Sequence, residues 1–368
     1  AQNFNRRAAM ITISLCMIVK NEEKCLGDAL ACGKKFADEI IIVDTGSTDK
    51  TKEIARNFTD KVFDFEWVYD FSKARNFAFD KATKEYLMWL DGDDILLEDS
   101  IEAINDWKEN GETAETIMCP YVTGFDSAYN PTFMFNRERI VKNLPILRWH
   151  DPVHEVITPY GKIITNEKIK VYHNKKNKPH TDRNLNIYKH MISQGLKFTP
   201  RQQFYYAREL YYNNFIDEAI HEFSIFISSK DGWIENKIEA CLNLSKCYQI
   251  KKDTDKALTC LFGSFVYSTP RGEILYEIGN IFFNLRNYQS AIYWYDLALK
   301  SKPDLDSGAF VNIDCYQFLP ALQLCVCYYK TGDIVKSRCY HELSKGFKPD
   351  DERVKFNETF FAKKAKDE

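Results

Sequence analysis

Residues 11–90 contain four short strand-like runs separated by segments with helical spacing, and this alternation constrains the fold more than any other feature. The runs cover residues 11–19, 39–43, 62–65 and 86–90, and the helical segments cover 21–33, 50–58 and 70–82. A continuous apolar run such as 11–19 is typical of a strand covered on both faces. Strands that alternate with helices predict a parallel sheet, so we expect an N-terminal α/β domain.

Two acidic turns follow two of these strands. The first begins at Asp44 and runs to Asp49, and the second is Asp91-Gly92-Asp93-Asp94. Ligands of open parallel sheets bind beyond the carboxyl ends of the strands, which is where both turns are expected.

The second turn is a candidate metal site. Neighbouring carboxylates repel each other unless a cation lies between them. Mg²⁺ or Mn²⁺ prefers oxygen ligands, and a diphosphate can complete the shell. Gly92 would let a phosphate approach the backbone closely. The alternative is an acidic turn that caps a following helix at residues 101–110.

Asp44 and Arg75 are candidate nucleotide contacts. A buried carboxylate at the sheet edge can accept the N–H of a uracil ring, although Asp44 could also serve as an N-cap or Asx-turn residue. Both roles can hold at once. Arg75, in a predicted helix, could reach the base or the diphosphate, and the alternative is a solvent-exposed cationic face.

Residues 115–173 combine short predicted strands at 117–122, 132–136 and 169–172 with several histidines. His150, His154 and His173 fall close together in sequence, and Glu155 follows His154. Histidine and carboxylate offer metal ligation or general-base chemistry. The alternative is that each histidine is an ordinary hydrogen-bonded residue.

From residue 182 onward the sequence is helical and repetitive. Four segments pair a large apolar residue with a small residue nine positions later: Leu210/Ala219, Tyr248/Ala257, Phe282/Ala291 and Tyr328/Ser337. This pattern resembles the tetratricopeptide repeat, a helical hairpin of about 34 residues. Stacked hairpins usually form a docking surface for a protein. The polar stretch 174–179 predicts a boundary, which gives domains 10–181 and 182–368.

Composition excludes some classes of protein. A net charge of −3 argues against nucleic acid as a partner. Eleven cysteines without a C-x-x-C pair indicate reduced thiols and a cytoplasmic protein. No apolar run approaches the roughly 20 residues of a membrane span. We expect residues 1–9 to be an expression remnant and Met10 the native start.

The motifs together resemble the family 2 glycosyltransferases of the GT-A fold. They are residues 14–23 (SLCMIVKNEE), 43–49 (VDTGSTD), 71–76 (FSKARN) and 91–93 (DGD). The continuation through 153–155, 170–174 and 183–186 is similar to the sublancin-type peptide S-glycosyltransferases. The resemblance implies a GT-A, Rossmann-like α/β domain that binds a nucleotide sugar, followed by an all-α domain of tetratricopeptide-like repeats.

The resemblance also implies residue roles. Asp44 would bind uracil with the backbone near Val19 and Asn21 and with Arg75. Asp91 would contact the ribose or metal, with Gly92 beside it, and Asp93 and His173 would hold Mg²⁺ or Mn²⁺. Glu155 would be the general base. His154 is a reserve ligand or catalytic residue, and His150 would line the acceptor site.

The expected activity is a metal-dependent, inverting transfer of a hexose or N-acetylhexosamine from a UDP-sugar. The expected acceptor is a Ser/Thr hydroxyl or Cys thiol of a peptide or protein, with a bacteriocin-type peptide favoured. The repeats would dock the acceptor or join a homodimer. One alternative is a transferase of cell-surface polysaccharide whose repeats serve dimerisation. The other is a non-catalytic scaffold with a decayed transferase domain.

Overall fold

The computed structural model describes residues 10–126, 129–174, 181–305 and 307–367, and it divides into two compact units. The first contains the residues up to Gly124 and Phe135–Lys197, and the second contains Phe125–Met134 and everything from Phe198 onward. The predicted expression remnant and most of the polar stretch 174–179 lie outside the described residues.

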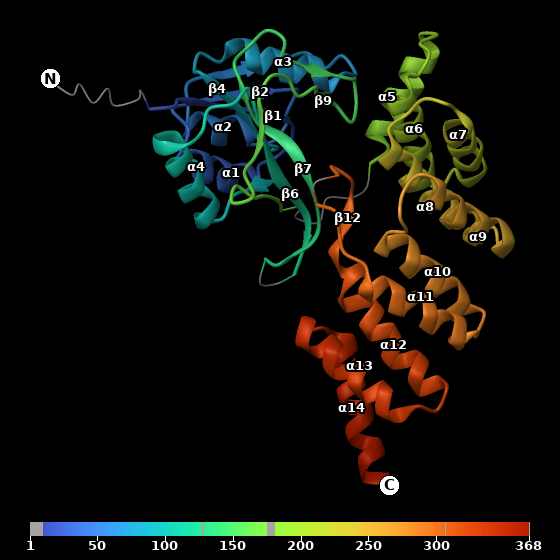
Figure 1. Ribbon diagram of the computed structural model, residues 1–368. Helices are drawn as coiled ribbons and strands as arrows, with labels where there is room; N and C mark the ends of the chain where they lie inside the picture. Colours follow the sequence, from blue (N-terminus) through green and yellow to red (C-terminus); the bar gives the residue numbers. More distant parts are fainter. Residues whose placement is uncertain (1–9, 127–128, 175–180, 306, 368) are drawn as a thin grey trace, which may run out of the picture. The chain divides into compact units, whose positions relative to one another are not determined.

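The first unit is built on a mixed sheet (Figure 1). The strand order of this sheet is β3-β2-β1-β4-β7-β6-β11-β5. Its four N-terminal strands are parallel, as the alternation predicts: β1 (Ile13–Val19), β2 (Glu39–Asp44), β3 (Val62–Asp64) and β4 (Tyr86–Trp89). The expectation of an α/β domain is therefore confirmed.

The remaining strands extend the sheet with mixed polarity. β7 (Pro131–Lys142) runs antiparallel to β4, and β11 (Val171–His173) runs parallel to β6 (Thr116–Phe125) but antiparallel to β5 (Asp94–Ile95). The short strand β10 (Ile163–Thr165) pairs with β6, whereas β8 (Trp149–His150) and β9 (Val156–Ile157) form a separate two-stranded sheet.

Helices cover both faces of the sheet. Leu15 and Met17 of β1 point into a core shared with α1 (Leu26–Gly33), α2 (Thr51–Arg56) and α4 (Glu98–Asn110). Cys16, between them, points to the opposite core, where α3 (Phe71–Lys81) packs. Because side chains alternate along a strand, an uninterrupted apolar run supplies both cores.

Helix α5 (Arg183–Ser193) belongs to the first unit, although the predicted boundary at 181/182 lies before it. Aromatic and cationic side chains hold it there. The Tyr69 ring stacks on His190 at 4.9 Å, and the guanidinium of Arg183 lies 4.6 Å from the centre of the Phe71 ring. These contacts explain why the compact units divide after Lys197.

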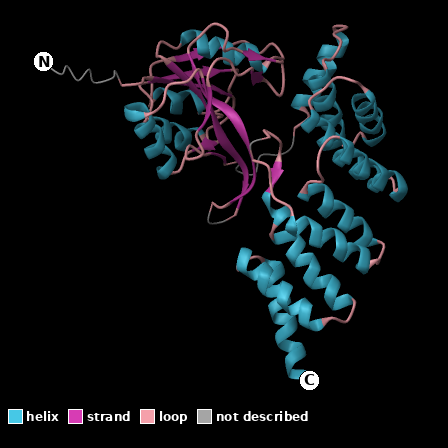
Figure 2. Cartoon of the chain, in the orientation of Figure 1, coloured by secondary structure: helices cyan, strands magenta, loops and turns pink. Residues whose placement is uncertain are grey.

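The second unit is a series of helical hairpins with one closing helix (Figure 2). The hairpins are α6 (Pro200–Tyr212) with α7 (Ile216–Ser228), α8 (Ile234–Ile250) with α9 (Thr254–Gly263), α10 (Gly272–Asn284) with α11 (Tyr288–Lys300), and α12 (Phe318–Lys330) with α13 (Ile334–Phe347). Helix α14 (Glu352–Asp367) follows, and the unit also contains two 3-10 turns, η1 (Ser264–Val266) and η2 (Ile313–Tyr316).

All four hairpins turn in the same way. The turn residues Asn214, Lys252, Arg286 and Gly332 each have a positive φ, between 60° and 86°. In the third hairpin the N–H of Asn287 returns to the carbonyl of Phe282, a Schellman-type closure. The predicted small residues Ala219, Ala257, Ala291 and Ser337 are all fully buried. The predicted repeat register is therefore confirmed.

The long spacing before the fourth hairpin is also explained. Residues 307–312 contain β12 (Val311–Asn312), which pairs antiparallel with Met134 and Phe133 at the tip of β7, inside the second unit.

Among the described residues, no helix has the length and apolar character needed to cross a bilayer.

Candidate active site

Asp44 ends β2 opposite Val19 of β1 and is 2% exposed. Its Oδ1 accepts hydrogen bonds from the N–H groups of Gly46 (3.0 Å) and Ser47 (2.8 Å). Its Oδ2 is buried and has no hydrogen-bond partner among the described residues. The Asx-turn role is therefore real, and one acceptor oxygen remains for a donor such as a uracil N–H.

The predicted backbone contacts at Val19 and Asn21 lie in the loop beside Asp44. The carbonyl of Val19 accepts from the N–H of Thr45 (2.9 Å). Asn21 has a φ of 55°, donates its N–H to Ser47 Oγ (2.9 Å) and accepts from the N–H of Thr48 through Oδ1 (2.8 Å). The loops after β1 and β2 are thus joined into one rim at the carboxyl edge of the sheet.

The turn Asp91–Asp94 follows β4 at the same edge. Asp94 Oδ2 accepts from the N–H of Asp91 at 3.0 Å, which closes the turn on itself. A Cβ on Gly92 would lie 2.7 Å from Cγ of Glu22, so a larger residue would displace that side chain. The alternative that the turn caps the next helix is wrong, because Leu97 occupies the N-cap position of α4.

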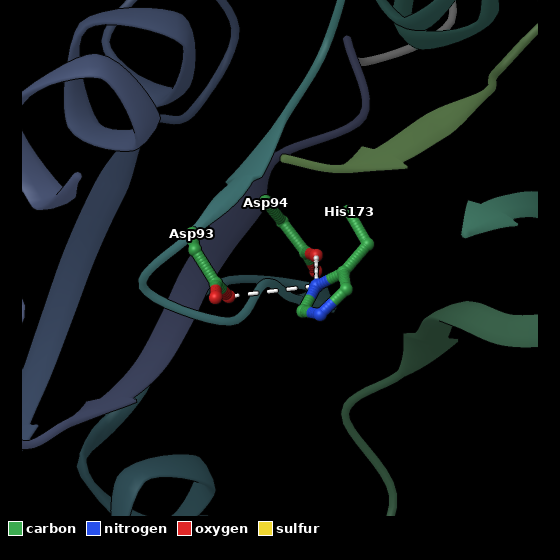
Figure 3. A group of neighbouring side chains, drawn as sticks. All are labelled: Asp93, Asp94 and His173. Carbon is green, nitrogen blue, oxygen red and sulfur yellow. Dashed lines mark hydrogen bonds and ion pairs between the residues drawn. The ribbon is translucent and has the colours of Figure 1, made fainter. Parts of the chain in front are cut away.

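Asp93, Asp94 and His173 form a cluster whose ligand atoms lie within 4.8 Å of one another (Figure 3). Strand pairing brings them together, because His173 of β11 is the register partner of Asp94 in β5. His173 Nδ1 lies 3.5 Å from Asp93 Oδ1 and 3.3 Å from Asp94 Oδ1. Two carboxylates and an imidazole fit a divalent cation such as Mn²⁺.

The electrostatics of the cluster agree with that fit. Burial by itself lowers the pKa of His173, but the hydrogen bond with Asp94 and the charges of Asp93, Asp94 and Asp91 raise it, and the net pKa is raised. Burial tends to raise the pKa of Asp91, yet the guanidiniums of Arg75 and Arg139 bring it far below its ordinary value. The carboxylates around His173 therefore favour positive charge at that position.

Arg139 is a site residue that the sequence reasoning missed. It is 0% exposed, its Nη1 lies 3.0 Å from Asp94 Oδ2, and the same nitrogen donates to the carbonyl of Trp89 (3.1 Å). Its guanidinium lies 3.6 Å from the centre of the Trp89 ring and 4.1 Å from that of Tyr121. Tyr121 also donates its hydroxyl to Asp94 Oδ1 (2.9 Å). Asp94 is thus held from two sides.

Arg75 lies in α3 and joins two candidate site residues. Its Nη2 is 2.6 Å from Asp91 Oδ1, and its Nε is 2.6 Å from Glu155 Oε1. It is 7% exposed, so the alternative of a solvent-exposed face is wrong for this residue. The structure thereby joins Glu155 and Asp91 through two nitrogens of one guanidinium.

The loop that carries Glu155 is tightly shaped. Asp151 and His154 have φ values of 70° and 52°, and the carbonyl of Pro152 accepts the N–H of Phe71 at 2.8 Å. Arg137 Nη2 donates to the Glu155 carbonyl at 3.1 Å. The His154 ring lies 6.4 Å from the Tyr188 ring, centre to centre, and His150 is exposed in β8. Their predicted roles stay predictions.

Comparisons with known proteins identify the family of the domain that contains this edge of the sheet. Residues 14–148 match the family described as Glycosyl transferase family 2, and residues 272–305 match a tetratricopeptide repeat. Residues 14–148 are a family 2 glycosyltransferase domain. The resemblance stated from the motifs is confirmed, and the repeat match falls on the hairpin α10–α11.

Two curated proteins are similar to parts of this chain. The SPbeta prophage-derived glycosyltransferase SunS of Bacillus subtilis is 30% identical over 224 residues, which is 57% of this chain and 51% of SunS. A TPR repeat-containing protein of Synechococcus elongatus is 34% identical over 150 residues, which is 41% of this chain and 36% of that protein. The chain thus spans about half or less of the length of these relatives.

A solved structure, Staphylococcus aureus TarS 1-349 in complex with UDP-GlcNAc, covers 90% of this chain and 91% of its own at 13% identity and a TM-score of 0.37. That likeness is too weak to bear on the fold or the ligand of this glycosyltransferase domain.

Proposed function

We propose that the protein transfers a hexose or N-acetylhexosamine from a UDP-sugar to a polypeptide, with inversion at the sugar carbon. The observation that carries the proposal is the gathering of Asp93, Asp94 and His173 at the sheet edge of a family 2 glycosyltransferase domain. The unused Oδ2 of Asp44 at the same edge supports it.

The uracil end of the donor is assigned to Asp44. A buried acceptor without a partner costs free energy that a hydrogen-bonded ligand restores. Asp44 Oδ1 is already fixed by two backbone N–H groups, so the direction of Oδ2 is fixed as well. A uracil N3–H would pair with this oxygen, whereas the N3 of cytosine, an acceptor, would be repelled by it.

The diphosphate end is assigned to the turn after β4. Asp93, Asp94 and His173 are the residues that would hold Mg²⁺ or Mn²⁺, and the bound cation would offset charge on the departing UDP. Arg139 partly neutralises the charge of Asp94 through their ion pair. Asp93, which is 6% exposed, is then the carboxylate that contributes most to cation binding.

Glu155 is assigned as the base that takes the acceptor's proton. Its side chain is 12% exposed and is fixed on one oxygen by Arg75, which leaves the other oxygen for an acceptor. A cysteine thiol is partly ionised near neutral pH and needs less help than a serine hydroxyl. Losing Glu155 should therefore impair transfer to serine more than transfer to cysteine.

A peptide or protein is the favoured acceptor. The motifs resemble those of peptide S-glycosyltransferases, the chain is similar to the glycosyltransferase SunS, and helical repeats commonly dock polypeptides. The eleven cysteines form no disulfide among the described residues, which agrees with a cytoplasmic reaction. A homodimer through the repeats remains a further expectation.

A thermal-shift screen with Mn²⁺ tests the donor, and mass spectrometry then tests the acceptor. UDP-glucose, UDP-galactose or UDP-N-acetylglucosamine should raise the melting temperature, while GDP-mannose should not, because ligands that bind only the folded state stabilise it. Incubation with a cysteine- and serine-containing peptide should add a hexose or N-acetylhexosamine mass. Stabilisation by GDP-mannose alone would contradict the proposed donor, and transfer only to an oligosaccharide would favour the polysaccharide alternative.

A further inference from the structure

We propose that Arg75 is a positioning residue that fixes Glu155 for proton removal and ties it to the donor-binding turn through Asp91. The inference rests on the proposed function and deepens it. It differs from the role expected from the sequence, in which Arg75 helps to bind the nucleotide base.

The two ion pairs of Arg75 use different nitrogens of one planar group. Nε pairs with Glu155 Oε1 and Nη2 pairs with Asp91 Oδ1, each at 2.6 Å. A guanidinium presents its donors in a rigid fork, so the two carboxylates are held at a fixed separation. Glu155 is on the loop before β9, and Asp91 is on the turn after β4. The side chain of Arg75 pairs with both carboxylates.

The guanidinium itself packs against two indole rings that also contact each other edge to face. Its central carbon lies 5.0 Å from the centre of the Trp89 ring and 4.8 Å from that of Trp149. Asn76, one residue after Arg75, clamps the backbone of Trp149, since Asn76 Oδ1 accepts from the Trp149 N–H (2.9 Å) and Asn76 Nδ2 donates to its carbonyl (3.0 Å). The Trp89 indole N–H donates to the carbonyl of Glu138 at 2.7 Å. Neither ring can swing away easily.

Burial makes this arrangement consequential. Arg75 is 7% exposed, and charges in such a setting interact more strongly than they do in water. One cation lies between two carboxylates, so its removal would leave them repelling each other. Glu155 would then turn away from the direction in which Arg75 now fixes it. Misplacing a catalytic group by about 1 Å commonly reduces rate by on the order of 100-fold.

The test is a set of variants measured for kcat, donor KM and UDP affinity. Arg75→Met and Arg75→Lys should both reduce kcat, by about 100-fold for methionine, while UDP binding with Mn²⁺ changes by less than about threefold. Lysine keeps the charge but lacks the fork, so it should not restore the rate. Lys73→Met is the matched control, because Lys73 lies in the same helix and its side chain is 67% exposed.

A double-mutant cycle with Glu155→Gln separates positioning from a general structural role. If Arg75 acts through Glu155, Arg75→Lys added to Glu155→Gln should cause no further loss of kcat. Fully additive losses, or a fall in UDP affinity that accounts for the whole effect, would overturn the proposal. If Arg75→Met fails to fold, the lysine variant carries the same comparison. A wild-type protein that transfers no sugar would refute the proposed function itself, whereas an active wild type with additive losses would refute the role of Arg75 alone.

Discussion

Asp94 and Arg139 form an ion pair with no exposed surface on either side chain, directly behind Asp93 and His173. Asp94 Oδ2 lies 3.0 Å from Arg139 Nη1, and its other oxygen faces Tyr121 and His173. The pair joins β5 to β7 across the sheet, and it fixes the side of the turn from which Asp93 projects. Arg139 therefore supports the candidate metal site through its ion pair with Asp94 and does not itself contact the ligand.

Breaking this pair should destabilise the first unit. Arg139→Met leaves a buried carboxylate without its partner, which costs about 3–5 kcal/mol. Lys35→Met is the control, since the Lys35–Glu98 pair is exposed and surface ion pairs add little to stability. Urea unfolding followed by tryptophan fluorescence measures both. Equal midpoints for the two variants would contradict the structural role of Arg139.

Asp44→Asn should change nucleotide preference without unfolding the protein. The amide oxygen can keep the bonds from Gly46 and Ser47, but the amide N–H₂ would replace Oδ2 and face the uracil N3–H. We expect UDP affinity to fall about tenfold or more, the equivalent of about 1.4 kcal/mol, and CDP affinity to rise relative to it. Calorimetry with both nucleotides measures the change. An unaltered ratio of UDP to CDP affinity would remove Asp44 from the base-binding site.

Glu39, at the opposite edge of the sheet, should make stability depend on pH in the acid range. Burial alone raises the pKa of Glu39, but hydrogen bonds from Lys61, Ser14 and Thr83 lower it from 4.5 to about 2. A carboxyl whose folded-state pKa is lowered contributes fully above its unfolded pKa, and the contribution is lost as pH falls toward the folded value. The contribution of the Glu39 charge to the free energy of unfolding is at most about 3 kcal/mol.

Melting curves of wild type and Glu39→Gln between pH 7 and pH 3 test this contribution. The difference in melting temperature should be constant above about pH 5 and shrink steadily below about pH 4.5. A difference that stays constant down to pH 3 would show that the charge of Glu39 does not matter.

Gly279 in the third hairpin should not tolerate a side chain. A Cβ there would lie 2.6 Å from the Tyr295 ring, which is fully buried and donates its hydroxyl to Asn280 (2.7 Å). Gly279→Ala should cost about 1–3 kcal/mol through overpacking. Gly346→Ala meets no atom within 4 Å and should be neutral or stabilising. Thermal melts of both variants give the comparison, and equal stability would contradict the packing described for this hairpin.

The sequence patterns predicted those elements of the first unit that depend on neighbouring residues. They failed where contacts with residues distant in the sequence determine the local structure. The helix expected from residue 21 begins only at Leu26, because residues 21–23 are bonded to the loop after β2 instead. Periodicity cannot reveal hydrogen bonds to a segment about 27 residues away. The short strands β8 and β9 were missed for the same reason, since two residues carry no periodic signal.

The candidate site shows the same division. Asp44 and His173 end strands and Asp93 lies in the turn after β4, and their positions were predicted from motifs and strand ends. Arg139 lies inside β7 with nothing in its sequence to mark it, except that Arg137 two positions earlier shares its face of the strand. That a buried arginine pairs with Asp94 depends on β4 and β7 being neighbours, which the sequence does not state.

Calorimetric titration of UDP with and without Mn²⁺ tests the central claim most directly, using wild type and Asp93→Ala. We predict that wild type binds UDP with Mn²⁺ and loses most of that binding with EDTA. Asp93→Ala should lose it even with Mn²⁺ while keeping the wild-type melting temperature, and its sugar transfer should fall about 100-fold or more. If UDP bound to wild type in EDTA, and to Asp93→Ala with Mn²⁺, as strongly as it binds to wild type with Mn²⁺, that result would contradict a cation held at this edge of the sheet.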